Sequence, residues 1–239
     1  NFFMSKTLIF TATYNEKENI KNLIENLNKL SLDIDILVVD DNSPDKTWEI
    51  LKKLEKEIKN LKKIIRENKS GLDTAHKLAF DYARNHNYEN FISMDADLSH
   101  DPNEIPKMLE ILKTSSFVIG SRYVKGGKCE MSGHRLALSI IGNKFIKKVL
   151  KINCNEFTTS YRGFNLSKLE NFNLNMIKSK GYSFFMETIF RLHKHQININ
   201  EIPIHFKNRR HGYSKIPGIE IFRTLKNLFL LYLENKQKK

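Results

Sequence analysis

The stretch Phe91-Ile92-Ser93-Met94-Asp95-Ala96-Asp97 decides how this chain is interpreted. Four residues typical of a buried strand are followed directly by two carboxylates with one residue between them. Mg²⁺ and Mn²⁺ prefer oxygen ligands, and Mg²⁺ usually combines one or two protein carboxylates with phosphate oxygens of a substrate. A D-x-D pattern alone is common on solvated turns, but its position after a strand predicts an Mg²⁺ or Mn²⁺ site at Asp95 and Asp97.

Apolar runs alternate with helical patterns on both sides of this stretch. We expect one helix to begin at Asn15, where Asn15-Glu16-Lys17-Glu18 resembles a capping box, and another near Ser43. This alternation predicts a mostly parallel sheet with helices on both faces, and we expect residues 1–239 to form a single domain. The expected strands are residues 8–13, 34–39, 63–66, 91–94 and 117–120, and further helices cover 74–84 and begin at Asp101.

A second acidic pair, Asp40-Asp41, ends another predicted strand. Ligands of open α/β sheets bind at the carboxyl ends of the strands, so we expect both acidic pairs to project into one crevice. Asp41 could accept hydrogen bonds from a nucleobase, while Tyr14 could stack on the base and Glu16 could bind either the ribose or the base. Helix capping near Ser43, and the preference of acids for helix starts, are the alternative explanations.

Several cationic residues are candidates for binding phosphate. Arg209 and Lys215 belong to a glycine-containing loop that could close over phosphates and exclude water. Arg122 follows a predicted strand, and Arg135 stands four residues before Ser139, so these residues could bind a second phosphate. Ordinary surface positions remain the alternative for all of them.

The net charge of +13 is concentrated in two segments. Lys125 to Lys151 contains seven basic residues and one acid, and His205 to Lys239 contains nine basic residues and two acids, which together account for the whole excess. Basic segments attract anionic lipids, phosphate-bearing ligands or nucleic acid. A nucleic-acid-binding module is the more remote alternative, because the basic residues accompany aliphatic faces and no recognition motif is found.

The same basic segments have amphipathic patterns. Ser139 to Ile152 is apolar on one side and rich in lysine on the other, and Ile219 to Leu233 is apolar with basic flanks. Such helices suit either a bilayer interface or a protein core. Because no run approaches the roughly 20 apolar residues of a spanning helix, and we expect no secretory signal at Asn1 to Phe10, we predict peripheral contact with a membrane. The two cysteines favour a reducing compartment.

Six motifs, in order and at suitable spacing, give the chain a family resemblance. The motifs are Thr13-Tyr14-Asn15-Glu16, Val38-Val39-Asp40-Asp41-Asn42-Ser43-Pro44-Asp45, Met94-Asp95-Ala96-Asp97-Leu98-Ser99-His100-Asp101-Pro102, Gly120-Ser121-Arg122-Tyr123, Gly181-Tyr182 leading to Met186-Glu187, and Arg209 to Lys215 as R-x-x-G-x-S-K. On these motifs the chain resembles dolichol-phosphate mannosyltransferases and their bacterial polyprenyl-phosphate relatives, within the inverting glycosyltransferases of family 2.

The resemblance implies a GT-A fold, with a nucleotide-sugar half at about residues 1–125 and an acceptor and membrane-surface half at about 126–239. It implies inverting transfer of mannose from GDP-mannose to dolichyl or polyprenyl phosphate at the cytoplasmic face of a membrane, with room for a membrane-anchoring partner subunit. The acceptor phosphate would contact Arg122, Arg135 and Ser139, and Mg²⁺ or Mn²⁺ would bind Asp95 and Asp97. The nucleotide-sugar would contact Ala12, Tyr14, Glu16, Val39, Asp41, Asp95, Ala96, Asp97, Arg122, Arg209 and Lys215.

Some residues depart from the pattern of the family. Ala12 replaces the usual Pro, Phe185 replaces Gln, and Asp73 replaces a Gly, where its carboxylate could repel a diphosphate, face solvent or bind a cation. Residues 156–162 are a loose version of D-x-T-x-x-F-R. Alternatives therefore include UDP-glucose or UDP-N-acetylglucosamine as donor, or a saccharide acceptor, for which Glu187 is the nearest candidate base.

Overall fold

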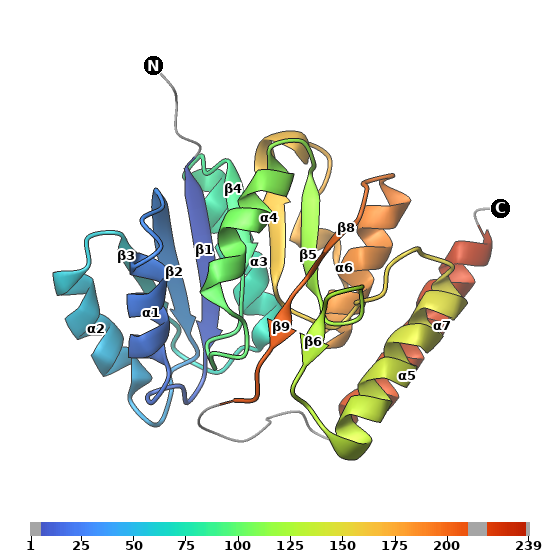
Figure 1. Cartoon of the computed structure of the whole chain (residues 1–239), viewed down its shortest axis with the longest axis horizontal. Helices are drawn as coiled ribbons and strands as arrows, with labels where there is room; N and C mark the ends of the chain where they lie inside the picture. Colours follow the sequence, from blue (N-terminus) through green and yellow to red (C-terminus); the bar gives the residue numbers. More distant parts are fainter. Residues whose placement is uncertain (1–5, 210–218, 238–239) are drawn as a thin grey trace.

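The central sheet contains seven strands in the order β3-β2-β1-β4-β7-β5-β8 (Figure 1). The structure is a computed structural model that describes residues 6–209 and 219–237. Only β7 runs antiparallel to its neighbours β4 and β5, and every other pairing in this sheet is parallel. The mostly parallel sheet is therefore confirmed. Its strands are β1 (Thr7–Thr13), β2 (Ile34–Asp40), β3 (Leu61–Ile65), β4 (Asn90–Ser93), β5 (Phe117–Ser121), β7 (Arg162–Asn165) and β8 (Asn200–Pro203).

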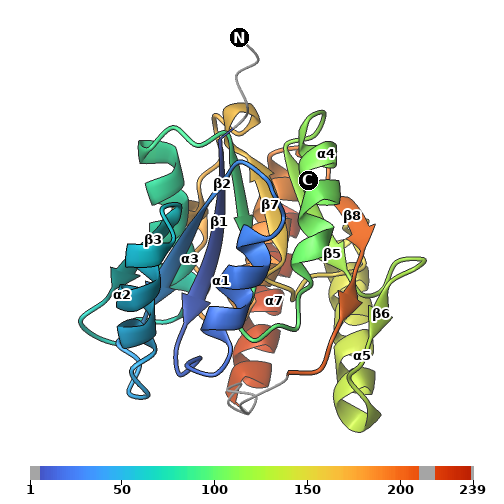
Figure 2. The ribbon, with the colours of Figure 1, turned by 60° about the vertical axis from the view of Figure 1, so that its left-hand side comes forward.

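Helices cover both faces of the sheet (Figure 2), as the alternating pattern predicts. One hydrophobic core lies beneath α1 (Ile20–Asn28), α2 (Thr47–Glu57) and α4 (Ile105–Leu112). The opposite core lies beneath α3 (Leu72–Asn85), α5 (Gly133–Leu150), α6 (Ser183–Lys194) and α7 (Ile219–Gln237). Short 3₁₀ turns are η1 (Pro102–Glu104), η2 (Leu166–Lys168) and η3 (Leu174–Met176), and a small parallel sheet pairs β6 (Lys128–Cys129) with β9 (His205–Phe206).

The antiparallel strand β7 brings the second half of the chain into the middle of the sheet. Its first residue, Arg162, is opposite Ser93 of β4 and Ile119 of β5, near the carboxyl ends of both strands. The segment that leads into β7, residues 156–161, therefore lies at the edge where ligands of parallel sheets bind. The alternation of apolar runs in the first 120 residues does not predict this insertion.

Two helix starts differ from the sequence prediction. The first helix begins at Ile20 rather than Asn15, because Asn15 has a left-handed φ of +58° and its N–H donates to Ser43 Oγ (3.0 Å). The second helix begins at Thr47, whose N–H and hydroxyl both donate to Asp45 Oδ1. Hydrogen bonds in the loops therefore place both helix starts a few residues later than predicted. A local capping pattern in the sequence does not reveal these hydrogen bonds.

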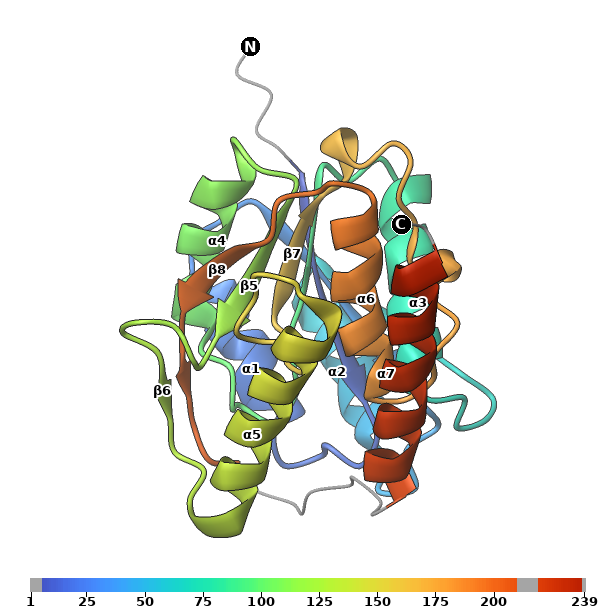
Figure 3. The ribbon, with the colours of Figure 1, turned by 90° about the vertical axis from the view of Figure 1, so that its right-hand side faces the viewer.

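Helices α5 and α7 lie side by side along one flank of the molecule (Figure 3). Ile146 and Leu150 of α5, and Leu228 and Leu231 of α7, are buried in the core. Other apolar side chains of the same two helices are exposed and form what we call the α5–α7 apolar surface: Leu138, Ile141, Phe145, Ile221, Phe222, Leu225, Phe229, Leu230 and Leu233. Among the described residues, no helix has the length and hydropathy needed to cross a membrane.

A buried histidine stands inside the core beneath α3. The His76 ring centroid lies 4.9 Å from that of Phe10, 5.6 Å from Phe184 and 5.1 Å from Phe185. Burial, assisted by the charge of Arg162, lowers the pKa of His76 to about 3. Since an unfolded histidine binds a proton near pH 6.5, the unfolded chain takes up more protons than the folded chain below that pH. His76 therefore destabilises the fold as the pH falls from 6.5 toward 3.

We expect His76→Phe to reduce this sensitivity to acid. At pH 4 the linkage at His76 costs the wild-type protein about 3 kcal/mol of unfolding free energy relative to pH 7, and phenylalanine cannot take up the proton. Urea denaturation at pH 7, 5.5 and 4, followed by circular dichroism, measures the difference between the two proteins. Parallel pH curves for wild type and variant would contradict the assignment.

Candidate active site at the carboxyl ends of the parallel strands

The acidic turn after β4 is held by its own hydrogen bonds. Asp97 Oδ1 accepts from the Ser99 N–H (3.1 Å) and from Ser99 Oγ (2.6 Å). Leu98, between them, has a left-handed φ of +64°, which is a rare conformation for a bulky residue. Such strain persists only where surrounding contacts enforce it, and it is common at functional sites.

A neutral histidine fixes the start of this turn. His100 Nδ1 accepts the backbone N–H of Asp95 (3.0 Å), so Nε2 carries the proton and donates to Thr159 Oγ1 (3.1 Å). The ring is buried and stacks on Tyr161 with centroids 4.9 Å apart. Burial lowers the pKa of His100, although the nearby carboxylates of Asp95 and Asp97 oppose that shift. His100 therefore stays neutral and continues to accept from Asp95.

The two predicted metal ligands have further partners. Ser160 Oγ donates to Asp95 Oδ1 (2.5 Å), and Arg209 Nε donates to Asp97 Oδ2 (2.6 Å). Asp95 is 36 % exposed, whereas the side chain of Asp97 is only 5 % exposed. The turn therefore offers one accessible carboxylate and one buried carboxylate that already balances a cation.

Two carboxylates fit Mg²⁺ or Mn²⁺ if a substrate supplies further oxygens. Within residues 6–209 and 219–237, no cluster of three or more His, Cys, Asp or Glu side chains could hold a metal by itself. The donor set is all oxygen, which suits a hard cation and not a closed zinc site. Because Arg209 occupies Asp97 Oδ2, a metal at this oxygen would have to share it with Arg209 or displace it.

Arg122 is less available to phosphate than its position after β5 suggests. Its Nε and Nη2 donate to the two carboxylate oxygens of Glu156 (2.7 and 2.8 Å), and Nη2 also donates to Thr158 Oγ1. Glu156 is fully buried; burial would raise its pKa, but the Arg122 guanidinium holds that pKa below the usual value. Phosphate binding by Arg122 stays a prediction, and Nη1 would have to provide it.

The prediction that Asp40 and Asp41 both enter the crevice is wrong for Asp40. Asp40 is fully buried, and its oxygens accept from Thr13 Oγ1 (2.7 Å) and from the Ser43 N–H (2.9 Å) and hydroxyl (2.6 Å). Its side chain points into the protein because it ties the ends of β1 and β2 together. Asp41 accepts from the Gly71 N–H (3.1 Å) and pairs with Arg66.

The other predicted nucleoside contacts follow β1 and β2. The Tyr14 ring centroid lies 3.8 Å from Lys69 Nζ, and Glu16 Oε2 accepts from Asn19 Nδ2 (2.9 Å). Val39 is fully buried in the core, so only its backbone can reach a nucleoside. Ala12 is partly buried beside the same core, and Ala96, in the acidic turn, is almost completely buried.

Two of the three predicted acceptor residues, Arg135 and Ser139, lie on α5, and the third, Arg122, directly follows β5. Arg135 is exposed, while Ser139 Oγ accepts from the Tyr123 hydroxyl (2.6 Å). Tyr123 follows Arg122, so this bond connects the end of β5 with the helix. Lys215 lies outside the described residues.

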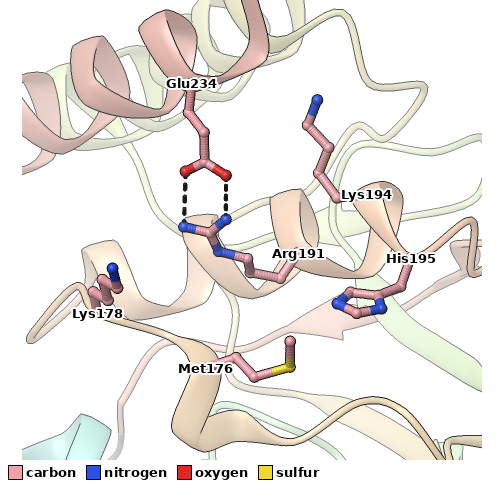
Figure 4. Close-up of a pocket in the computed structure, with 6 residues that line it drawn as sticks. All are labelled: Met176, Lys178, Arg191, Lys194, His195 and Glu234. Atoms are coloured by element: carbon pink, nitrogen blue, oxygen red, sulfur yellow. Dashed lines mark hydrogen bonds and ion pairs between the residues drawn. The ribbon is translucent and has the colours of Figure 1, made fainter. Parts of the chain in front are cut away.

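A cavity of about 420 Å³ lies elsewhere, between α6, α7 and the segment before α6 (Figure 4). Inside it, Arg191 forms two bonds to Glu234, at 2.5 and 2.9 Å. It contains none of the predicted site residues; its lining is Met176, Lys178, Arg191, Lys194, His195 and Glu234. The predicted site residues therefore lie outside this cavity.

Residues 8–172 match the family model described as Glycosyl transferase family 2, and this match covers more than half of the chain. The chain belongs to this family. The resemblance seen in its motifs is confirmed.

Curated relatives in this family include three proteins with related names. Polyprenol monophosphomannose synthase of Mycolicibacterium smegmatis is 33 % identical over 219 residues, covering 90 % of this chain and 83 % of the relative. Undecaprenyl-phosphate mannosyltransferase of Micrococcus luteus is 34 % identical over 214 residues, covering 89 % and 88 %. Dolichol-phosphate mannosyltransferase of Pyrococcus furiosus is 34 % identical over 234 residues, covering 95 % of this chain and 63 % of the relative.

Solved glycosyltransferase structures share the fold. Glucosyl-3-phosphoglycerate synthase from Mycobacterium tuberculosis, in complex with Mn²⁺, UDP and glucosyl-3-phosphoglycerate, has a TM-score of 0.68 at 12 % identity and covers 97 % of this chain and 80 % of its own. S. aureus TarS 1–349, in complex with UDP-GlcNAc, has a TM-score of 0.64 at 16 % identity and covers 95 % and 66 %. The GT-A-like fold is therefore confirmed.

In this family 2 glycosyltransferase, residues 156–160, just before β7, contact the predicted site. No role was assigned to these residues from the sequence. Glu156 pairs with Arg122, Thr159 accepts from His100, and Ser160 donates to Asp95. The available signal was the loose D-x-T-x-x-F-R pattern at residues 156–162. Its partners lie far away in sequence, so the pattern alone did not show what each residue contacts.

We expect Glu156→Ala to destabilise the protein by about 3–5 kcal/mol, because the nearly buried Arg122 would lose its only carboxylate partner in the described ion pairs. Glu110→Ala is the matched control, since its pair with Lys113 is exposed and worth about 0–1 kcal/mol. Urea denaturation at pH 7 measures both values. Equal small effects would show that the Arg122–Glu156 pair does not hold the 156–158 segment.

Proposed function

We propose that this protein transfers mannose from GDP-mannose to dolichyl or polyprenyl phosphate, with inversion at the anomeric carbon. The observation that carries the proposal is the acidic turn Asp95–Asp97 at the carboxyl end of β4, adjoined by Arg209. It is supported by the names of three relatives at 33–34 % identity: two are named as mannosyltransferases of undecaprenyl phosphate and dolichol phosphate, and one is named as a synthase of polyprenol monophosphomannose. A UDP-sugar donor is the alternative within the same reaction class.

Asp95 and Asp97 would hold Mg²⁺ or Mn²⁺ in this proposal. When bound, the metal would neutralise negative charge on the departing diphosphate. The M. tuberculosis structures that contain Mn²⁺ with UDP support metal use in this fold. Arg209, already paired with Asp97, supplies a second positive charge beside the leaving group.

The acceptor needs no strong base from the protein. A phosphate monoester has its second pKa near 6, so its oxygen is already a nucleophile at neutral pH. The site residues then have to align the reactants and stabilise charge, and no proton transfer is required of them.

The state of Glu187 favours a phosphate acceptor over a saccharide acceptor. Glu187 is buried and accepts from the Lys178 and Ser179 N–H groups and from Arg191 Nε and Nη2. Burial would raise its pKa, but these hydrogen bonds hold the pKa below the usual value. A saccharide hydroxyl would need a general base, and Glu187 is a weak, fully engaged one.

The residue roles implied by the resemblance belong to this proposal. Residues of the nucleotide-sugar half, about 1–125, bind the donor, and residues of the acceptor half, about 126–239, bind the acceptor and the membrane. The nucleoside contacts are Ala12, Tyr14, Glu16, Val39 and Asp41; the phosphate contacts are Arg122, Arg209 and Lys215; and the acceptor phosphate contacts are Arg122, Arg135 and Ser139.

The α5–α7 apolar surface supports a peripheral position on a membrane. Phe222 is 75 % exposed and Phe229 is 58 % exposed, which are high values for large apolar side chains of a folded protein. Lysines 144, 147, 148 and 151 of the α5 segment can attract anionic headgroups. A polyprenyl tail would stay in the bilayer while its phosphate reaches the site from the cytoplasmic face, with or without an anchoring subunit.

The transfer assay is the direct test of this function. We expect wild-type protein with radiolabelled GDP-mannose, a short polyprenyl phosphate and Mg²⁺ or Mn²⁺ to transfer label into the lipid phase, and EDTA to stop the transfer. Asp97→Ala should lower the rate at least a hundredfold, because charge stabilisation at the diphosphate is lost.

The same assay separates the alternatives. Transfer from UDP-glucose or UDP-N-acetylglucosamine, but not from GDP-mannose, would show that the proposed donor is wrong. The proposed mechanism of transfer would still hold. Glu187→Gln should retain activity if the acceptor is a phosphate, whereas a saccharide acceptor predicts loss of the chemical step. Absence of lipid label with every donor would overturn the proposed function.

We also expect the double substitution of Phe222→Ser and Phe229→Ser to weaken binding to anionic vesicles more than tenfold. Each buried phenylalanine contributes about 1.5–3 kcal/mol, and both side chains are exposed enough to be replaced without loss of the core. Flotation with phosphatidylglycerol vesicles measures binding. Leu78→Ser is the matched control on α3, since Leu78 is 38 % exposed and lies outside the apolar surface; an equal loss in that variant would contradict the assignment.

A further inference from the structure

Arg209 stands at the end of a short segment that begins with β9 and continues through residue 208. β9 pairs in parallel with β6, and the two strands lie side by side in Figure 1. The guanidinium of Arg209 reaches Asp97 in the acidic turn, with 2.6 Å between Arg209 Nε and Asp97 Oδ2. The contacts that fix residues 205–208 therefore also limit where Arg209 can stand.

One residue, Glu130, binds both ends of this segment. Its Oε1 lies 3.0 Å from His205 Nε2, and its Oε2 accepts the backbone N–H of Asn208 (2.8 Å). The backbone of Glu130 adds two bonds, since its N–H donates to the Phe206 carbonyl (2.9 Å) and its carbonyl accepts from Asn208 Nδ2 (3.1 Å). Glu130 thus contacts three of the four residues that directly precede Arg209.

The acidic turn binds the remaining residue, Lys207. Its backbone N–H donates to the Ser99 carbonyl (3.0 Å), and its Nζ donates to Asp101 Oδ2 (2.7 Å). Ser99 is also the residue whose N–H and hydroxyl both donate to Asp97. The segment is therefore held by the acidic turn itself and, independently, by Glu130.

Glu130 is too exposed for its ion pair to be explained as a source of stability. Its side chain is 42 % exposed, and that of His205 is 43 % exposed. Ion pairs at such exposure contribute little to the stability of a fold, because water screens the charges. The carboxylate nevertheless binds the backbone amide next to Arg209, so its effect is on orientation. A cation stabilises a departing diphosphate only when it is held where the negative charge develops.

We propose that Glu130 is a positioning residue, which holds the segment before Arg209 so that this guanidinium faces the donor diphosphate beside Asp97. The inference rests on the proposed function, because Arg209 meets a diphosphate only if the chain binds a nucleotide-sugar there. Glu130 touches no atom of the donor in this arrangement and acts through Arg209.

Glu130 can be replaced with less disturbance than the other anchor of the segment. Asp101 also accepts the Asn103 N–H (3.0 Å) at the start of η1, so its loss would disturb that turn as well. Glu130→Ala removes both carboxylate bonds and leaves the backbone bond to Phe206 in place. Glu130→Gln keeps an oxygen that can accept the Asn208 N–H, so it should recover most of what Glu130→Ala loses.

Asp81 of α3 provides a matched control. Its two carboxylate oxygens accept from Asn173 Nδ2 (3.2 Å) and Asn175 Nδ2 (2.8 Å), so it also holds a loop through directional bonds. That loop, residues 173–175, contains none of the predicted site residues. Asp81→Ala therefore tests whether the loss of any loop anchor has the same effect as the loss of Glu130.

The experiment compares nucleoside diphosphates with monophosphates in the full chain. Calorimetric titration in the presence of Mn²⁺ measures the Kd of GDP, GMP, UDP and UMP, and the melting temperature is recorded for each variant. We expect Glu130→Ala to weaken binding of the preferred diphosphate about five- to tenfold. Binding of the matching monophosphate should change less than about twofold, because it lacks the phosphate from which the sugar departs and beside which Arg209 acts.

Transfer kinetics give a second readout. Because negative charge on the diphosphate grows as the sugar leaves, we expect Glu130→Ala to lower kcat about tenfold. Asp81→Ala should keep both kcat and diphosphate affinity within about twofold of wild type, even if its melting temperature falls as far as that of Glu130→Ala.

A double-mutant cycle shows whether Glu130 acts through Arg209. In the Arg209→Ala background, Glu130→Ala should cost less than about twofold in diphosphate affinity. Full additivity of the two losses, an unchanged diphosphate affinity in Glu130→Ala, or an equal loss in Asp81→Ala would overturn the inference. A wild-type chain that binds neither GDP nor UDP would instead overturn the proposed function, and this inference with it.

Discussion

The buried guanidinium of Arg162 is the interaction on which the site depends. Its three nitrogens donate to the carbonyls of Thr159, Phe185 and Phe157, at 2.8, 2.8 and 3.0 Å. Burial lowers the pKa of Arg162 to about 9, so it remains a cation at neutral pH. A buried charge is tolerated only when its hydrogen bonds are satisfied, and these carbonyls satisfy it. One side chain thus joins the start of β7, the 156–160 segment and α6.

The residues that this cation fixes are those that hold the acidic turn. With the segment before β7 in place, Ser160 reaches Asp95, Thr159 reaches His100, and Glu156 reaches Arg122. The insertion of β7 between β4 and β5 brings this segment to the carboxyl ends of the strands. The second half of the chain therefore completes a site whose acids come from the first half.

Charge balance explains the arrangement of the remaining site residues. An unpaired carboxylate in a buried position is costly, so Asp97 pairs with Arg209, Asp41 with Arg66, and Glu156 with Arg122. The pairs differ in how they are enclosed. In the first pair Arg209 is 29 % exposed and Asp97 is 5 % exposed, whereas in the third pair the Arg122 side chain is only 7 % exposed and Glu156 is fully buried. Arg209 is therefore the cation that a charged ligand can reach more easily, and the pair of Arg122 with Glu156 also holds the segment before β7 in place.

The sequence by itself determined most strands and helices of the first 120 residues, though not the starts of two helices, and it determined the position of the acidic turn. Apolar periodicity is a local property, so it gave the parallel strands, the helices on both faces, and Asp95 and Asp97 after β4. Tertiary structure alone decided which polar groups meet, because the partners are distant along the chain: Arg122 and Glu156 are 34 residues apart, and Asp73 and Gly181 are 108 apart. Neighbouring Asp40 and Asp41 look alike in sequence, yet one is turned inward by Thr13 and Ser43 while the other binds Gly71. That difference arises from satisfying buried hydrogen bonds across the sheet, and a local pattern carries no information about it.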